Sequence, residues 1–364
     1  MTVNAVRIAG IGSYLPGPAV DQDGVRRYLR RHPDSLSELE QDRLLAVTGI
    51  KTRHFAIDLE HEFCRETNTS MAASAGARAL RAAGWSPKDV ELLIVTTVIP
   101  DQLVPSTSAL VQEALGIDRC AELEISANCT APTKGLRVAA SQLQLGTYRR
   151  ALICSSQFAT FTLNPPWTNP ARMTPNQAHL RWVLSDGAAA IALEAGGPDI
   201  GLRIHLESVG VGKRPGMSLA LGAAYPDIAA SFASGTHHVT QDARYVLKEG
   251  IQLATEGLAR MLRAFELPGE SIDHFIPSVS SVQIERRLQS KFAELGIRPD
   301  AWRTNFTRVG YVGSVAVPIM LDELYSQGRL RPGEIVCTVA EESSKWMFAG
   351  TIFRWNPAVE CTTA

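Results

Sequence analysis

Short apolar runs that alternate with helix-forming segments constrain this fold more than any other feature of the sequence. Residues 91–98 and 150–156 are nearly continuous apolar runs, which are typical of strands buried on both faces of a sheet. Segments 69–83 and 132–145 instead repeat small and apolar residues at helical spacing. This alternation predicts an α/β protein with a parallel or mixed sheet and helices on its faces.

The C-terminal part of the chain repeats this order of parts. A predicted strand at 274–278 precedes a helix, and a second helix then leads to a predicted strand at 334–340. With 364 residues, the chain has room for such a duplicated core. We therefore expect two halves, 1–195 and 196–364, with a loop or lid region at 210–240.

The bulk composition argues against several classes of function. The formal net charge is -1 and no Lys or Arg block stands out, so neither nucleic acid nor an anionic membrane surface is expected as a partner. The N-terminus lacks the features of a signal peptide, and no apolar run approaches the roughly 20 residues that span a bilayer. The six cysteines form no CxxC pair, which argues against a metal site or disulfides and predicts a cytoplasmic protein.

Cys129 lies where a β-prone run, 121–126, passes through a short turn into the predicted helix at 132–145. The first turn of a helix presents unpaired N–H groups and the positive end of the helix dipole, which favour a thiolate over a thiol. A thiolate is the nucleophilic form that can carry an acyl group. The alternative is a small buried hydrophobic residue, as most free cysteines are.

Five runs that together span most of the chain carry a family resemblance: TGIKTRH (48–54), TTVIPDQLVPST (96–107), NCTA (128–131), SDGAAA (185–190) and GYVGSVAVPIMLDE (310–323). They resemble the ketoacyl-acyl-carrier-protein (ACP) synthase III branch of the thiolase superfamily. The run after Ile276 is similar to that of its acyltransferases in antibiotic biosynthesis. The resemblance implies a thiolase-like αβαβα sandwich of two duplicated halves, which forms a homodimer or pairs with a homologue. It also implies that Cys129 is the acyl-accepting nucleophile.

Two positions depart from the family pattern. Members place a His after Ile-Pro in the first C-terminal strand and an Asn after the Gly of a later turn, where this chain has Ser278 and Tyr311. Both family residues donate hydrogen bonds while malonyl loses carbon dioxide, and losing one such donor costs roughly 3 kcal/mol. Decarboxylative condensation is therefore not expected. Ser278 is either a hydrogen-bonding replacement or filler in a lost site, and Tyr311 either lines the pocket or plugs it.

The resemblance also places the oxyanion hole and the acyl donor. The oxyanion hole is expected at the Cys129 amide and in a loop where Ser344 has the aligned amide. Arg43 stands where relatives stack an aromatic residue on coenzyme A. This favours an acyl-ACP thioester, although an arginine also suits the phosphates of coenzyme A. No permanently bound cofactor is expected, and the sequence specifies neither the acyl group nor its small-molecule acceptor.

Other polar residues have plainer interpretations. His274 shares a strand face with the predicted hydroxyl site but lies roughly 13 Å along that strand, which favours a structural role. His237 and His238 fall in the unpatterned loop region and are expected to be solvated. Glu341 and Glu342 can supply a base, but pairing with a nearby lysine or surface exposure is the plainer expectation.

The sequence leaves three functions open. The first is an acyltransferase of secondary metabolism that loads an acyl group on Cys129 and passes it to an oxygen or nitrogen nucleophile. The second is a starter-unit synthase that forms carbon–carbon bonds with unusual catalytic partners. The third is an inactive subunit that pairs with an active homologue. The first is favoured, because the usual condensing residues are replaced while Cys129 is present.

Overall fold

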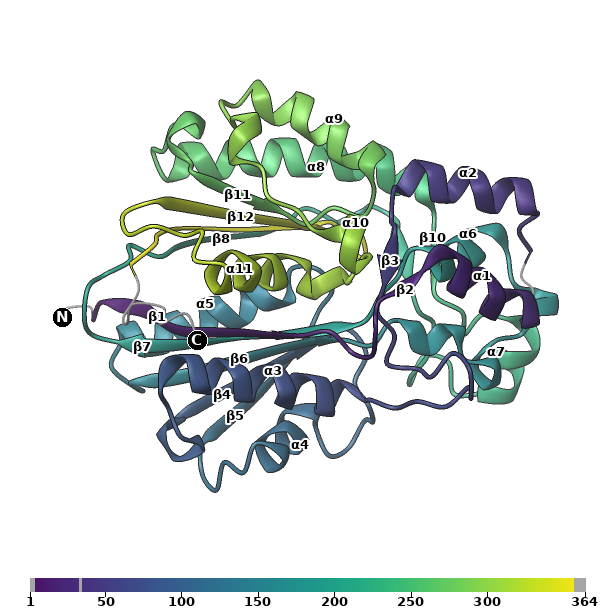
Figure 1. Ribbon diagram of the computed structural model, residues 1–364, viewed down its shortest axis with the longest axis horizontal. Helices are drawn as coiled ribbons and strands as arrows, with labels where there is room; N and C mark the ends of the chain where they lie inside the picture. Colours follow the sequence, from purple (N-terminus) through teal and green to yellow (C-terminus); the bar gives the residue numbers. More distant parts are fainter. Residues whose placement is uncertain (1–3, 33–34, 357–364) are drawn as a thin grey trace.

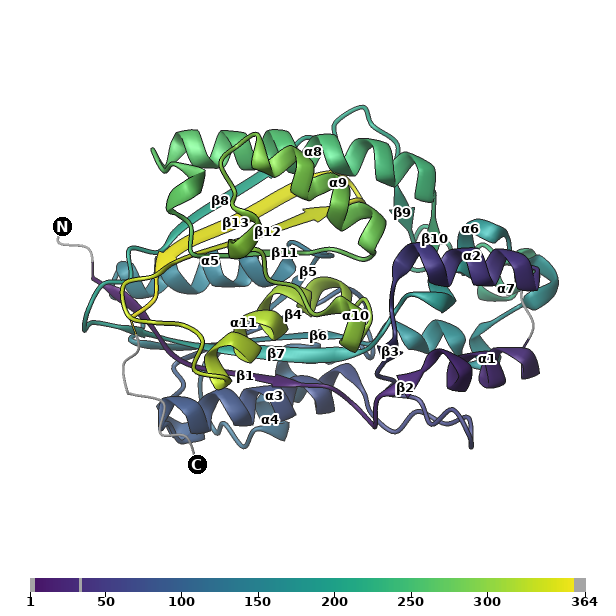
Figure 2. The same ribbon diagram turned by 45° about the horizontal axis from the view of Figure 1, so that its top comes forward.

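The structure, a computed structural model, describes residues 4–32 and 35–356. Its layers are seen edge-on in Figure 1, where helices, a sheet, helices, a second sheet and further helices follow one another. Figure 2 turns the same layers forward and shows the second sheet lying over α5 and α11. The architecture is the αβαβα sandwich that the sequence predicts.

The first sheet has five strands in the order β1-β7-β6-β4-β5. β4 runs parallel to β5 and β6, whereas β7 is antiparallel to β6 and β1. Every residue of β4 is buried, as a continuous apolar run predicts for a strand between two helix layers. The strand bounds are Val6–Tyr14 (β1), Leu92–Thr97 (β4), Ala121–Ser126 (β5), Arg150–Gln157 (β6) and Gly187–Ala195 (β7).

The second sheet has four strands in the order β11-β12-β13-β8. β11 is parallel to β12, and the other two pairs are antiparallel. All its strands lie within 203–354, whereas those of the first sheet lie within 6–195. The division into domains at residue 195 stays a prediction. The strand bounds are Arg203–Ser208 (β8), His274–Pro277 (β11), Ile335–Glu342 (β12) and Met347–Arg354 (β13).

Helices cover both sheets and fill the space between them. α3 and α4 lie against the first sheet, α5 and α11 lie between the sheets, and α8 and α9 lie on the outer face of the second (Figures 1 and 2). α3 approaches β1 closely because Gly10 and Gly12 have no side chain: a Cβ at either would lie 2.5 Å from the Ala79 backbone. The bounds are Asn68–Ala83 (α3), Thr107–Ala114 (α4), Ala131–Gln144 (α5), Ala243–Ala264 (α8), Val282–Ala293 (α9) and Ala316–Ser326 (α11).

Shorter elements gather at one end of the layers, on the right in Figure 1. α2 begins with a capping box between Ser37 and Glu40 and ends at Gly49, whose φ of 69° suits glycine. The region 210–240 contains β9, α7 and the start of β10, and its role as a lid stays a prediction. The bounds are Val20–Asp21 (β2), Gln22–Arg31 (α1), Glu38–Thr48 (α2), Thr52–Arg53 (β3), Pro175–Ala178 (α6), Met217–Ser218 (β9), Ile228–Ser234 (α7), Thr240–Gln241 (β10) and Phe306–Val309 (α10).

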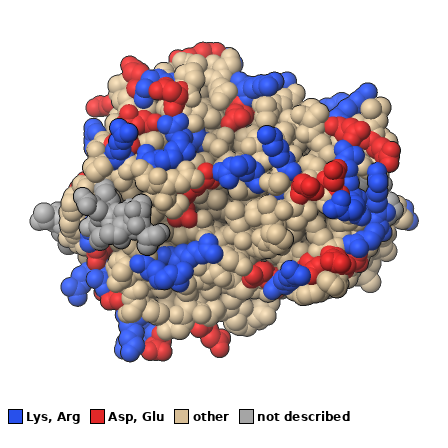
Figure 3. Space-filling model, in the orientation of Figure 1, with Lys and Arg blue, Asp and Glu red and all other residues tan. Residues whose placement is uncertain are grey.

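The surface charges, the helices and the cysteines bear on which kinds of site are present. Lys and Arg are interspersed with Asp and Glu over the face shown in Figure 3. Within 4–32 and 35–356, no helix has the length and apolar character to cross a membrane. The same residues hold no cluster of His, Cys, Asp and Glu suited to a metal ion. The cysteines in this part of the chain are free thiols, and Cys361 lies outside the described residues.

Candidate active site

A cavity of about 370 Å³ lies at the end of the layers where strands of both sheets finish. Thr97 and Gln157 reach it from the first sheet, and Glu341 reaches it from the second. The carboxyl ends of parallel strands are a common place for a ligand site, and the volume suits a small molecule. Much of the wall is apolar and comes from α2, α8 and the segment before β7: Leu44, Val47, Leu180, Val183, Val246 and Ile251.

Cys129 lies between β5 and α5 and lines this cavity. The residue as a whole is half-buried. The Sγ of Cys129 is 3.2 Å from the Oη of Tyr311. Ser278, directly after β11, lines the same cavity. The structure therefore brings together the three residues that the sequence singled out.

The backbone around Gly310 holds Tyr311 in place. Gly310 has a φ of 78°, and a Cβ there would lie 2.7 Å from the Cβ of Ser185. Tyr311 donates its N–H to the carbonyl of Val183 at 3.1 Å and accepts from the N–H of Ser185 at 3.0 Å. Burial, and then the neighbouring Cys129, raise the pKa of Tyr311 well above 10. Its hydroxyl therefore stays protonated, and it lines the cavity without closing it.

The thiol of Cys129 is not acidic, which corrects the expectation drawn from the helix start. Burial raises its pKa to about 12; the hydrogen bond with Tyr311 lowers the pKa, and the carboxyls of Glu342 and Glu341 raise it. Glu342 is buried beneath the start of α5, where it accepts from the Asn128 N–H at 3.1 Å and the Thr130 hydroxyl at 2.6 Å. A carboxylate at this position offsets the positive end of the helix. Burial is thus the main reason that the thiol is favoured, and Glu342 opposes the effect of the helix start.

The adjacent Glu341 has different surroundings. It is half-buried and lines the cavity, and within the described chain no other residue forms a hydrogen bond or ion pair with its carboxyl. Burial raises its pKa to about 8. Lys345 pairs with neither glutamate, because its Nζ donates to the Lys213 carbonyl at 2.7 Å. The expectation of exposed or lysine-paired carboxyls was wrong, because β12 places one glutamate under α5 and the other in the cavity.

Ser344 and Arg43 lie at the edge of the site. The hydroxyl of Ser344 donates to Glu342, and its neighbour Ser343 is the residue of that loop that lines the cavity. The role of the Ser344 amide in an oxyanion hole stays a prediction. Arg43 is exposed on α2, beside Leu44, which lines the cavity. A contact between Arg43 and an acyl donor also stays a prediction.

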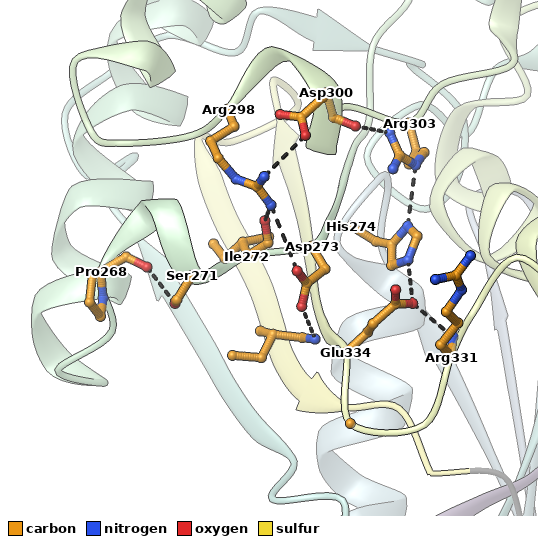
Figure 4. A network of polar contacts seen from close by, with 12 residues as sticks. Pro268, Ser271, Ile272, Asp273, His274, Arg298, Asp300, Arg303, Arg331 and Glu334 are labelled. Atoms are coloured by element: carbon orange, nitrogen blue, oxygen red, sulfur yellow. Dashed lines mark hydrogen bonds and ion pairs between the residues drawn. The ribbon is translucent and has the colours of Figure 1, made fainter.

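Four of the histidines differ in their surroundings. His274 lies in the polar network of Figure 4, where its Nε2 is 2.8 Å from Glu334 and its Nδ1 accepts from Arg303 at 3.2 Å. It begins β11, whereas Ser278 follows the end of that strand, so its surroundings agree with the structural role expected. His179 lines the cavity and was missed, because it lies in a segment of short turns with no motif.

His237 and His238 are buried, 0% and 4% exposed, so the expectation of solvated rings was wrong. The ring nitrogens of His237 lie 3.0 Å from the carbonyl oxygen of Ser231 and 2.7 Å from that of Trp167. His238 accepts from the N–H of Asn169 at 2.9 Å. These bonds join α7 to the loop that begins near residue 164. The pair therefore holds two loops together.

Comparison with known proteins places the chain in a family. Two family descriptions match it: 3-oxoacyl-[ACP] synthase III over residues 123–210, and the C-terminal part of the same enzyme over 262–355. The chain is 27% identical to a beta-ketoacyl-[ACP] synthase III of a Bradyrhizobium species over 361 residues, covering 98% of this chain and 100% of the relative. The chain belongs to the synthase III family. Enzymes of this family form an acyl-cysteine intermediate and take acyl groups from ACP or coenzyme A thioesters.

Two solved structures share the fold of nearly the whole chain. AbyA1, described as a tetronic acid condensing enzyme, is 26% identical, with a TM-score of 0.79 over 96% of this chain and 100% of its own. The synthase III of Aquifex aeolicus is 22% identical, with a TM-score of 0.77 over 96% and 100% of the two chains. Both comparisons cover nearly all of this chain, so the site lies within the fold that these structures share.

Proposed function

We propose that this synthase III homologue is an acyltransferase. Cys129 takes an acyl group from an ACP or coenzyme A thioester and passes it to an oxygen or nitrogen nucleophile of a small molecule. The proposal depends on one observation above all: Ser278 and Tyr311 occupy the cavity beside Cys129 in place of the two expected donors. A cavity of about 370 Å³ accommodates an acyl chain or a small acceptor beside the sulfur.

The contact of Tyr311 suits acyl transfer better than decarboxylation. Its hydroxyl lies 3.2 Å from the sulfur, so it can stabilise negative charge on the sulfur when the thioester bond breaks. Loss of carbon dioxide from malonyl instead needs donors directed at the oxygen of a second thioester, where an enolate develops. Acyl transfer to oxygen or nitrogen forms no enolate and needs no such donors.

Condensation is the second candidate function. It is favoured by the likeness to AbyA1, whose description is that of a tetronic acid condensing enzyme. A carbon nucleophile would use the same acyl-cysteine but would first have to lose a proton or carbon dioxide. The hydroxyls of Ser278 and Tyr311 are poor bases near neutral pH, so this route requires another group.

The remaining parts of the proposal concern partners and setting. We expect an ACP as the acyl donor, and a homodimer or a heterodimer with a homologue. We also expect a cytoplasmic location and a place in antibiotic or polyketide biosynthesis. All of these agree with the family. Leu103 and Val104 are 85% and 84% exposed, as suits a loop that reaches a partner subunit. An inactive subunit is less favoured, because Cys129 opens onto a formed cavity.

Intact-mass spectrometry tests the proposed function. The protein is incubated with acyl thioesters of N-acetylcysteamine, which mimic the pantetheine arm, beside the C129A variant. We expect one acyl adduct on the parent protein, absent from C129A and removed by alcohols or amines as esters or amides. Carbon dioxide release from a malonyl thioester would instead support condensation. Absence of an adduct with every donor would contradict both functions.

A further inference from the structure

Glu341 is a cavity carboxyl that, among the described residues, has no partner other than its own backbone N–H, and it shares the cavity with the nucleophile. We propose that Glu341 is the general base and acid of this site, which moves protons to and from Cys129 and the acceptor. The proposal rests on the acyl-cysteine chemistry proposed above and adds the group that the sequence comparison left unassigned. The usual histidine is absent, yet loading and transfer each require a proton to be taken up and returned.

The geometry of β12 separates the tasks of two adjacent glutamates. Successive side chains of a strand point to opposite faces, so Glu341 and Glu342 have different surroundings although both influence Cys129. Glu342 turns towards the start of α5, where its oxygens are held by Asn128 and Thr130. Glu341 lines the cavity, and no other residue of the described chain holds its carboxyl.

Other cavity groups are less suited to the role. The hydroxyls of Ser278 and Tyr311 are poor bases, and the pKa of Tyr311 lies well above 10. His179 is the other titratable candidate, but its Nε2 lies 3.3 Å from the Gln241 amide oxygen and its Nδ1 lies 3.4 Å from the Pro175 carbonyl. A base whose ring nitrogens already have partners must break a contact before it acts.

The acidity of Glu341 supports this role. A pKa of about 8, raised by burial, lies close to neutral pH, where a general base and acid is most effective. Its charge also raises the pKa of Cys129, so the two groups lie near enough to influence each other. The carboxyl is mostly protonated at neutral pH and becomes a base as the pH rises through about 8.

The two steps balance with Glu341 as the proton carrier. In loading, the carboxylate takes the thiol proton, the sulfur of Cys129 bonds to the thioester carbonyl, and the departing pantetheine thiolate receives the proton. In transfer, the carboxylate takes the hydroxyl or amine proton as the acceptor attacks the acyl carbon. The carbon–sulfur bond then breaks, and the proton returns to the sulfur of Cys129. No oxidant, reductant or metal enters either step.

The experiment measures discharge of an acyl-enzyme, so it does not depend on knowing the natural acceptor. Cys129 is loaded from hexanoyl-N-acetylcysteamine, excess donor is removed, and loss of the adduct to water or 1-propanol is followed by intact mass. We expect the parent rate to rise with pH and level off above about 8. Glu341→Gln should discharge roughly 100-fold more slowly and lose this inflection, as removal of a general base predicts.

A second variant separates catalysis from a structural role. Glu341→Ala opens space beside the acyl group, and added formate should restore its discharge, whereas formate should not help Glu341→Gln. Glu294→Gln, at the exposed end of α9, is the control for loss of one carboxyl and should match the parent. Thermal melts establish that each variant is folded.

The outcomes distinguish the proposed role of Glu341 from the proposed acyltransferase function on which it rests. If no donor acylates Cys129, the proposed function fails first. If the adduct forms but Glu341→Gln discharges with the parent rate and pH profile, only the role of Glu341 is overturned. It is likewise overturned if His179→Gln, rather than Glu341→Gln, removes the inflection.

Discussion

The Oη of Tyr311 lies 3.2 Å from the Sγ of Cys129, although the two residues are 182 positions apart in the chain. This contact joins the two halves of the fold at the nucleophile, since Cys129 follows β5 and Tyr311 precedes α11. Family members are expected to have an Asn at the second position, where it faces a substrate oxygen. Here a phenol contacts the sulfur itself.

Tyr311→Phe removes this donor while keeping the ring that lines the cavity. Because the hydroxyl stays protonated, it can donate to the sulfur as negative charge develops there. A hydrogen bond to a charged group contributes about 1.5–3 kcal/mol, so acylation of Cys129 should slow roughly 10- to 150-fold. The rate of adduct formation from hexanoyl-N-acetylcysteamine measures this. An unchanged rate in a folded variant would mean that the contact has no part in the chemistry.

Glu342→Gln should make Cys129 more reactive. The carboxylate that raises the pKa of the thiol is lost, so at neutral pH alkylation by iodoacetamide should accelerate several-fold. The hydrogen bonds to the start of α5 change from charged to neutral, and the free energy of unfolding should fall by about 1–3 kcal/mol. The pH dependence of alkylation and urea unfolding measure the two effects. Slower alkylation by the folded variant would contradict this account of the thiol.

The position of the nucleophile could be predicted from sequence, but its acidity could not. Cys129 stands at a local strand–turn–helix pattern, and Ser278 and Tyr311 stand at family motifs, so each was found from neighbouring residues. The pKa of Cys129 instead depends on Glu342, which is 212 positions from its hydrogen-bond partner Thr130. No local pattern shows that β12 delivers a carboxylate to the start of α5.

Some strands could likewise be predicted from the sequence, whereas others could not. β4 and β6 were predicted because both faces of each are buried and their apolar runs are continuous. β13 was missed because Ala349 and Gly350 interrupt its apolar pattern. A Cβ at Gly350 would lie 2.4 Å from the sulfur of Met261 on α8, so the small residue is set by packing against that helix. The burial of His237 and His238 was also not predicted, because it depends on contacts with a loop that is distant in the sequence.

Ser278→His combined with Tyr311→Asn restores the residues that condensing relatives are expected to carry. The double variant presents two donors to a thioester oxygen, and each is worth roughly 3 kcal/mol to the developing enolate. We therefore expect it to release carbon dioxide from a carbon-13-labelled malonyl thioester well above the parent rate. The two single variants are controls and should release less, because the donors act on one oxygen. Equal release by the parent protein would show that other groups already support decarboxylation.

His238 should make the fold sensitive to acid. Burial, with the charges of His237 and Arg181, lowers its pKa from 6.5 to about 4. Between these values the unfolded chain binds a proton that the folded chain does not, so stability falls as the pH drops from about 6.5 to 4. His238→Gln can still accept from the Asn169 N–H but cannot gain the proton, so its free energy of unfolding should fall less across this window. Urea unfolding at matched ionic strength measures the difference. Because His54 and His179 contribute equally to both proteins, identical pH slopes would exclude His238 as the source.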